Sequence, residues 1–386
     1  MKLDGVRVID LSLFLPGPQM TLMMADQGAE VIKIENPAEG EPSRHIGLAK
    51  AGHTVWFRNT HRGKKSVALN LKTEAGREIL LELAETADVL VESFRPGVVD
   101  RLGISYDVVK RRAPRLVYCS ISAFGQHGPL RDKPAHDLAV QALAGTLSLG
   151  LGQDGKPAAP NLPSADVTAS MVALAGVLMA LFRRERTGRG DYVDIAMQDA
   201  LMSWLPHATG PVLAEDRPNR PKEERQTGGA AMYHIYETKD GKHVTLGGSE
   251  VKFARNLLEA WGRPDLVALC AQPPGPVQDA VKRFFAETFR TRTRDEWTAW
   301  FEGRDICFAP VLDMKEAFHQ PQVAAREMLV RDPQGVEHIG TPIKFTEEPG
   351  RLDFALPKLG EHTRAVLKSI GYSDADIEAF QRQGVF

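Results

Sequence analysis

Residues 134–194 read PAHDLAVQALAGTLSLGLGQDGKPAAPNLPSADVTASMVALAGVLMALFRRERTGRGDYVD, and this stretch decides the fold. After Asp166 comes an apolar run that carries no charge until Arg183. Such a run is too apolar for a surface helix and slightly short for a membrane span, so it predicts a helix buried in the protein core. Asp166 is then expected at or near the N-terminus of that helix.

Two acid–base candidates stand about thirty residues apart in this stretch, His136 with Asp137 and then Asp166, each where an apolar run begins. A carboxylate at a helix N-terminus faces unpaired N–H groups and the positive end of the helix dipole. Two interpretations of Asp166 follow from the residues alone. It is either a functional carboxylate or only the N-cap of its helix, a position that Asp often occupies.

Length and composition describe a globular protein. The chain has 386 residues, too many for one ordinary core, so we expect two domains. Hydrophobic residues make up 43% and the net charge is −2, which gives no reason to expect nucleic acid or an anionic membrane as partner. The start resembles no secretory signal, and the three cysteines form no CxxC pair. A reducing, cytoplasmic location is the expectation.

The N-terminal half alternates strands and helices. Residues 1–36 read as strand, loop, helix and strand, and residues 74–124 repeat the alternation, which predicts an α/β fold with a parallel sheet. The loop 16–19 and Arg95 each follow a strand directly, at the edge where open α/β sheets bind ligands. The loop after the first strand carries no GxGxxG motif, so we do not expect a dinucleotide there. The segment Arg62-Gly63-Lys64-Lys65 is either a phosphate clamp or a solvated basic turn.

The pattern changes after residue 194. Residues 195–210 read as a second apolar helix, and residues 208–228 as a polar, proline-rich linker. From residue 229 a β-hairpin turns at Lys239-Asp240-Gly241, and helical segments follow it. We expect a smaller α+β domain over about residues 229–315.

The chain resembles the class III CoA-transferase (CaiB/BaiF) family, which includes the α-methylacyl-CoA racemases. The resemblance implies a large Rossmann-like α/β domain built from both chain ends (residues 1–207 and 316–386), a linker at 208–228, a small α+β domain (229–315) and an interlocked homodimer. Eight segments, in the family's order, carry it: DLSLFLPGPQMTLMMADQGAEVIKIE, NTHRGKKSVALNLK, ESFRPGVVDRLG, SISAFGQHGP, PAHDLAVQALAG, SADVTAS, RRERTGRGDYVDIAM and GRDICFAPVL.

The family's catalytic aspartate matches Asp166. The resemblance implies that this carboxylate attacks an acyl-CoA thioester, forms an aspartyl-acyl anhydride and then an enzyme–CoA thioester, and passes CoA to a carboxylic acid. Coenzyme A is then a substrate, and no metal and no permanently bound cofactor are expected. Segment matches place CoA phosphates at Arg62, Arg95 and Arg101, and further CoA contacts at Gln19, Asn70, Leu71 and Lys72. The pair Gly228-Gly229 matches the family's mobile glycine loop, although the glycine run is shorter here.

A racemase is the alternative function. Racemases of the family carry His-Asp where this chain has His136-Asp137, and Glu250 matches their glutamate. A racemase needs two bases on opposite faces of the α-carbon, and His136 facing Asp166 and Glu250 would supply them. Structural interpretations also exist, because His136 could hydrogen-bond the loop 125–129 and Glu250 could simply begin a helix.

The surrounding residues favour the transferase. The segments LAVQALAG and PSADVTAS look more like transferases than like racemases, so we expect a CoA-transferase. A third possibility, a non-catalytic acyl-CoA-binding protein, fits poorly with an intact Asp166 motif.

Overall fold

A computed structural model describes residues 1–152 and 154–386. The chain divides into two compact units. The first comprises Met1–Ala144, Leu162–Trp204 and Pro321–Phe386, and the second comprises Gly145–Asn161 and Leu205–Gln320. The boundaries expected at 207 and 316 differ from these by a few residues, whereas the placement of 145–161 with the second unit was not anticipated.

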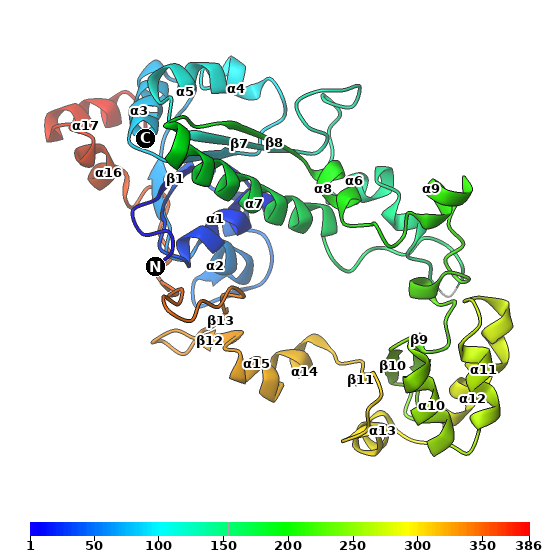
Figure 1. The fold of residues 1–386 in the computed structure, drawn as a ribbon. Helices are drawn as coiled ribbons and strands as arrows, with labels where there is room; N and C mark the ends of the chain where they lie inside the picture. The colour runs from blue at the N-terminus through cyan, green and yellow to red at the C-terminus, as the bar shows by residue number, and fades with distance from the viewer. Residues whose placement is uncertain (153) are drawn as a thin grey trace. The chain divides into compact units, whose positions relative to one another are not determined.

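The first unit is built on a six-stranded sheet in the order β5-β2-β1-β6-β7-β8, with every neighbouring pair parallel (Figure 1). This doubly wound order reverses direction between β1 and β6, which makes that junction the switch point of the sheet. The predicted parallel α/β fold is confirmed. The strands are β1 (Arg7–Asp10), β2 (Glu30–Glu35), β5 (Lys65–Ala68), β6 (Val89–Glu92), β7 (Val117–Ser122) and β8 (Tyr192–Ala196).

Helices cover both faces of this sheet. Alternate strand residues pack into two separate hydrophobic clusters, so both faces are buried and the strands read as continuous apolar runs. One cluster joins the sheet to α1 (Pro16–Ala25) and α7 (Ser164–Thr187), which lie side by side in Figure 1. The opposite cluster is covered by α3 (Glu74–Glu85), α5 (Tyr106–Arg112), α16 (Thr363–Ser369) and α17 (Asp374–Arg382).

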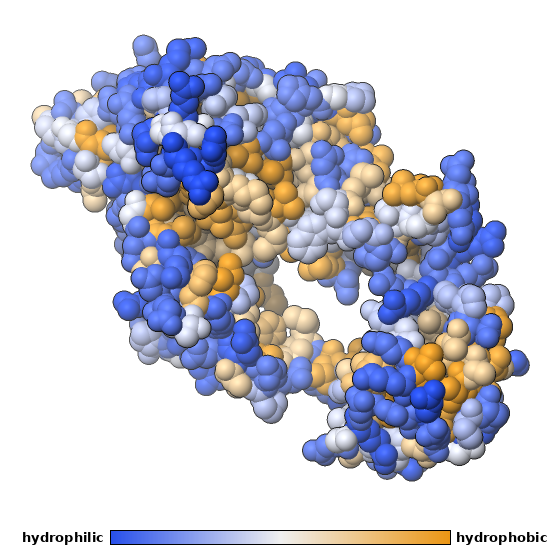
Figure 2. Space-filling view, viewed as in Figure 1, coloured by the Kyte–Doolittle hydropathy of each residue, from blue (hydrophilic) through white to orange (hydrophobic). Residues whose placement is uncertain are grey.

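Helix α7 is the buried helix predicted from the apolar run after Asp166. By length and composition it could cross a membrane, and half of its most apolar window is buried in the structure. Its other side exposes Leu178, Met179 and Phe182, and Figure 2 shows apolar side chains gathered along it. The helix ends at Gly188, whose φ of 67° is the left-handed conformation of a helix C-cap.

Strand β8 is a difference from the sequence analysis, which predicted no strand here and began a helix at residue 195. Residues 192–196 extend the sheet because their backbone pairs in parallel with β7 and because Ile195 packs into the core beside α7. Helix α8 (Met197–Ser203) begins only after the strand. The charged residues before Tyr192 interrupt the hydrophobicity pattern, so the pattern does not predict this strand.

The remaining elements of the first unit are short. A hairpin of β12 (Leu329–Arg331) and β13 (Glu337–Ile339) confirms the hairpin character expected near the C-terminus. The others are β3 (Ala49–Lys50), β4 (His53–Thr54), α2 (Val55–His61), α4 (Val98–Arg101), α6 (Asp137–Leu143) and α15 (Pro321–Ala325).

The second unit has its own small antiparallel sheet. Strands β9 (Tyr233–Glu237) and β10 (His243–Gly247) form the predicted hairpin, and β11 (Phe308–Pro310) joins β10. An aromatic cluster that includes Trp261, Phe289 and Trp297 fills its core. Its helices are α9 (Gly210–Glu215), α10 (Val251–Ala260), α11 (Val267–Cys270), α12 (Asp279–Phe289), α13 (Arg294–Phe301) and α14 (Met314–Phe318).

The C-terminal tail completes the free edge of β5. The Ala68 amide donates to the Thr363 hydroxyl at 2.9 Å, and the His362 amide donates to the Ser66 carbonyl at 2.9 Å. Just beyond the strand, the Asn70 amide donates to the Val385 carbonyl at 2.7 Å. Backbone groups that would otherwise form an open sheet edge are therefore paired with residues about 300 positions later in the chain.

Candidate active site

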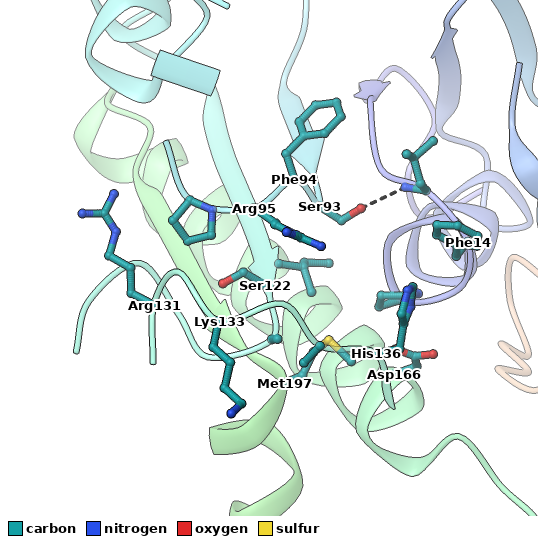
Figure 3. Close-up of a pocket in the computed structure, with 16 residues that line it drawn as sticks. Phe14, Ser93, Phe94, Arg95, Ser122, Arg131, Lys133, His136, Asp166 and Met197 are labelled. Atoms are coloured by element: carbon teal, nitrogen blue, oxygen red, sulfur yellow. Dashed lines mark hydrogen bonds between the residues drawn. The ribbon is translucent and has the colours of Figure 1, made fainter. Parts of the chain in front are cut away.

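A cavity of about 300 Å³ lies at the switch point of the sheet, within the first unit. It is formed where the chain leaves β1, β6 and β7, the location at which open α/β sheets bind ligands. Figure 3 shows its labelled side chains. The lining residues are Leu13, Phe14, Pro16, Ser93, Phe94, Arg95, Pro96, Ile121, Ser122, Ala123, Arg131, Lys133, Ala135, His136, Asp166 and Met197.

Asp166 lies in this cavity, in the first turn of α7. The helix begins at Ser164, so the expectation that Asp166 stands near a helix N-terminus is confirmed. Burial and, as the smaller cause, the neighbouring charge of Asp137 together raise the pKa of its carboxyl group to about 7. A carboxyl group with this pKa can exchange its proton near neutral pH and is a reactive base when ionised.

Asp137, and not Asp166, satisfies the amides at the start of α7. One carboxylate oxygen of Asp137 accepts from the backbone N–H groups of Ala165 (2.8 Å) and Asp166 (3.2 Å). Its other oxygen accepts from the Gln141 side chain at 2.6 Å. The interpretation of Asp166 as a simple helix cap is therefore wrong, because a carboxylate from α6 occupies the capping site and leaves that of Asp166 beside the cavity.

His136 lines the same cavity, so the structure brings together two of the three predicted catalytic residues. It is the residue before α6, and its exposed ring packs edge-on against Phe14, with ring centroids 5.8 Å apart and planes at 90°. Within residues 1–152 and 154–386 the structure has no hydrogen bond from this imidazole to the loop 125–129, which removes that interpretation.

Cations surround the cavity. Arg95 follows β6 as expected from the sequence, and in Figure 3 its guanidinium points inward, whereas the side chains of Arg131 and Lys133 extend away from the centre. Arg131 and Lys133 were missed because they lie in an irregular glycine- and proline-rich segment without a periodic pattern. Ser122 also lines the cavity, and its hydroxyl has no hydrogen-bond partner among the described residues.

The basic segment 62–65 is neither an open phosphate clamp nor a solvated turn. Arg62 is only 2% exposed and donates through one nitrogen to the Asp26 carboxylate at 2.6 Å, while its buried Nε and Nη1 have no hydrogen-bond partner among the described residues. Lys64 is equally buried and donates to Asp10 at 3.0 Å. Sequence reasoning missed this burial because both carboxylate partners are distant in the chain.

The other predicted CoA contacts lie outside the set of residues lining this cavity. Arg101 is exposed at the end of α4, and Gln19 is half-buried in α1. The Asn70 side chain accepts from the Lys72 amide at 3.1 Å and donates to the Gly384 carbonyl at 3.4 Å, so the segment with Leu71 is fastened to the C-terminal tail.

Two predicted features belong to the second unit and are described there alone. Glu250 precedes α10, is exposed and makes no side-chain capping bond. Gly228 has a φ of 107°, which favours glycine, and Gly229 is buried against the backbone of Glu223 and Glu224, where a side chain would collide. The glycine pair is therefore required for a close backbone approach in this conformation.

Comparisons with known proteins identify the family of this chain. The model of "CoA-transferase family III" matches residues 3–363. An acetyl-CoA:oxalate CoA-transferase of Acetobacter aceti is 35% identical, over 96% of each chain. The human alpha-methylacyl-CoA racemase is 31% identical over 98% of this chain and 95% of its own length. The crystal structure of a CaiB/BaiF family protein from Brucella suis superposes with a TM-score of 0.83 at 29% identity, covering 95% of this chain and 99% of that one. These matches confirm the resemblance read from the sequence, and the chain belongs to CoA-transferase family III.

Proposed function

We propose that this protein transfers coenzyme A from an acyl-CoA thioester to a small dicarboxylic acid, with Asp166 as the nucleophile. The observation that carries the proposal is the position of Asp166, a half-buried carboxylate in a cavity at the sheet's switch point, with a pKa near 7. Family membership supports CoA transfer in general, and the geometry supports the finer assignment of roles.

In the proposed reaction the Asp166 carboxylate attacks the thioester carbonyl and expels CoA thiolate, which leaves an aspartyl-acyl anhydride. The thiolate attacks the aspartyl carbonyl, releases the donor acid and forms an enzyme–CoA thioester. The acceptor carboxylate attacks this thioester and expels the thiolate again, and the thiolate then takes the acceptor's acyl group from Asp166. Each step develops negative charge on a carbonyl oxygen, and the unpartnered Ser122 hydroxyl is our candidate donor to it.

The charge of the cavity supports a doubly charged acceptor. One carboxylate of the acceptor must reach Asp166, and the inward-pointing guanidinium of Arg95 is suited to bind a second one. The relative from Acetobacter aceti is named for oxalate, a dicarboxylate, as acceptor. Under this proposal Arg95 acts on the acceptor, although the resemblance in the sequence assigned it to CoA phosphates.

The remaining expectations stay proposals. Arg101 is the exposed cation that we assign to CoA phosphates, with Gln19 and the segment 70–72 as further contacts. We propose a homodimer, for which the apolar exposed side of α7 is a suitable interface. A cytoplasmic enzyme without a permanent cofactor completes the proposal.

The test is a matrix of acyl-CoA donors against mono- and dicarboxylic acids, read by mass spectrometry. The wild type is expected to form new acyl-CoA only with a dicarboxylate, and Asp166→Asn is expected to form none. Hydroxylamine added with the donor should convert Asp166 to its hydroxamate, which peptide mapping would locate. Asp107→Asn, an exposed aspartate on α5, is the matched control and should behave as wild type. Full activity of Asp166→Asn would disprove the proposal.

Racemisation is the second candidate, and one specific observation favours it: an imidazole and a carboxylate, His136 and Asp166, line the same cavity. A racemase must break the α-C–H bond, whereas CoA transfer does not touch it. A 2-methylacyl-CoA incubated in D₂O without an acceptor acid should therefore gain no deuterium. Deuterium at the α-carbon, entering more slowly in His136→Ala and Glu250→Gln, would establish the racemase instead.

A further inference from the structure

Phe14 has a backbone conformation that its residue type disfavours. It lies in the loop between β1 and α1, and its φ of 63° puts a bulky aromatic residue in the left-handed region. In that region Cβ approaches the following carbonyl oxygen, at a cost of about 1–2 kcal/mol for residues other than glycine. Such conformations persist only where the surroundings hold them, and they cluster at functional sites.

Buried polar groups hold this loop in place. The Phe14 amide donates to Glu41 at 3.0 Å, and the Leu13 amide donates to the Ser93 hydroxyl at 2.9 Å. Glu41 is fully buried and lies 3.3 Å from the ammonium group of Lys33, which itself donates to the Ser12 carbonyl. One buried ion pair therefore holds the loop at two points, the Ser12 carbonyl and the Phe14 amide.

The strained conformation places the Phe14 ring at the cavity wall. There it meets the His136 imidazole edge-on, with ring centroids 5.8 Å apart. The centroid of the Trp56 ring lies 6.5 Å from that of Phe14. Edge-to-face ring pairs of this kind have a preferred geometry and are worth about 0.5–1.5 kcal/mol. His136 is otherwise exposed and, among the described residues, has no side-chain hydrogen bond, so this contact is what orients its ring.

We propose that Phe14, held in its left-handed conformation by Glu41, is a positioning residue that fixes the His136 imidazole in the cavity beside Asp166. The backbone strain is retained because a relaxed conformation would swing the ring away from His136. The inference rests on the proposed function only for the consequence on turnover. The orientation of His136 is a property of the free protein and can be measured without substrate.

The test compares the NMR spectra of Phe14→Gly, Phe14→Ala and Phe14→Tyr with histidine ring carbons labelled. The His136 signal is assigned by its loss in His136→Gln. In wild type the ring current of Phe14 displaces the chemical shift of the His136 signal. We expect this displacement to vanish in Phe14→Gly and to persist in Phe14→Tyr. Phe94→Leu, which alters another aromatic residue of the cavity wall, is the control and should leave the signal in place.

Stability and kinetics give two further readouts. Glycine accepts a φ of 63° without strain, so Phe14→Gly should unfold at a higher denaturant concentration than Phe14→Ala, although both lose the ring. Where His136 acts as a base, as in the racemase candidate, Phe14→Gly should slow deuterium entry at the α-carbon about tenfold and change the KM for acyl-CoA by less than about twofold, because the defect lies in orientation and not in binding. The steps of CoA transfer do not use His136, so the kcat of transfer should stay within about twofold of wild type. Phe14→Tyr should behave as wild type in both assays.

An unchanged His136 signal in Phe14→Gly would overturn the inference. Failure of the proposed function has a different signature. If Asp166→Asn still transferred CoA while the His136 signal moved in Phe14→Gly, the assigned chemistry would be wrong and the positioning role would stand.

Discussion

Substituting Asp137 by asparagine should move the pH dependence of catalysis without disturbing the fold. The asparagine side-chain oxygen can still accept from the amides of Ala165 and Asp166, so the start of α7 stays satisfied. What the substitution removes is a negative charge beside Asp166. The Asp166 carboxyl then ionises at lower pH, and the pH midpoint of kcat/KM, which reports the free enzyme, should fall.

The structure bounds the size of this shift. The pKa of Asp166 is raised from 3.8 to about 7, a difference of about 3 pH units, and burial is the larger of its two causes. Asp137 therefore accounts for less than half, at most about 1.5 pH units. With a midpoint lowered by about 1 pH unit, the ionised fraction of Asp166 at pH 6 rises from about one tenth to about one half. At pH 6 the kcat/KM of the variant should therefore be up to about fivefold that of wild type. The weaker base is also a weaker nucleophile, which reduces this gain.

The assay is kcat/KM for the acyl-CoA donor between pH 5 and 9, with circular dichroism at each pH to exclude unfolding. Asp107→Asn removes one negative charge from α5 and should leave the midpoint where it is in wild type. A midpoint in Asp137→Asn equal to that of wild type, in a folded enzyme, would refute the reasoning. It would mean that burial alone sets the pKa of Asp166 or that the profile belongs to another group.

Three further predictions follow from the same residues. First, the folded-state pKa of Asp166 lies above its unfolded value, so the wild-type protein loses stability as pH rises from about 4 to about 7. In urea unfolding, Asp166→Asn should therefore have the same free energy of unfolding as wild type near pH 4. At pH 8 its free energy of unfolding should be higher than that of wild type by up to about 4 kcal/mol. Second, Arg95→Ala should raise the KM of a dicarboxylate acceptor at least about tenfold and that of the donor much less, while Arg101→Ala should do the reverse in the same steady-state assay. Third, sedimentation at the lowest measurable concentration should find a species of twice 42.5 kDa, and a stable single chain would contradict the proposed dimer.

The parts of this molecule that could be predicted are those encoded by local patterns. The apolar run after Asp166 predicts a helix packed against the core, and the turn at residues 239–241 specifies its hairpin. What escaped prediction depends on partners distant in sequence. Asp137 caps a helix that begins 27 residues later, and Arg62 is buried because Asp26, 36 residues earlier, pairs with it.

Strain was equally invisible in the sequence. An aromatic residue carries no signal for a positive φ, and the loop around Phe14 reads as an ordinary strand-to-helix connection. The buried Glu41, the Ser93 hydroxyl and the ring of His136 explain its conformation, and all three come from other segments. Strand β8 escaped for a related reason, since its β-structure derives from pairing with β7 and not from its own composition.

The pairing of the C-terminal tail with β5 constrains how the protein is made. The first unit needs residues from 321 onward, which leave the ribosome only after the whole second unit has been synthesised. At about 5–20 residues per second, the roughly 180 residues after Trp204 take about 9–36 s, during which the edge of β5 has no tail to pair with. Translation speed over the second unit therefore sets how long an unpaired sheet edge is accessible to other nascent chains, and a truncated chain lacking α16 and α17 would leave this edge unpaired.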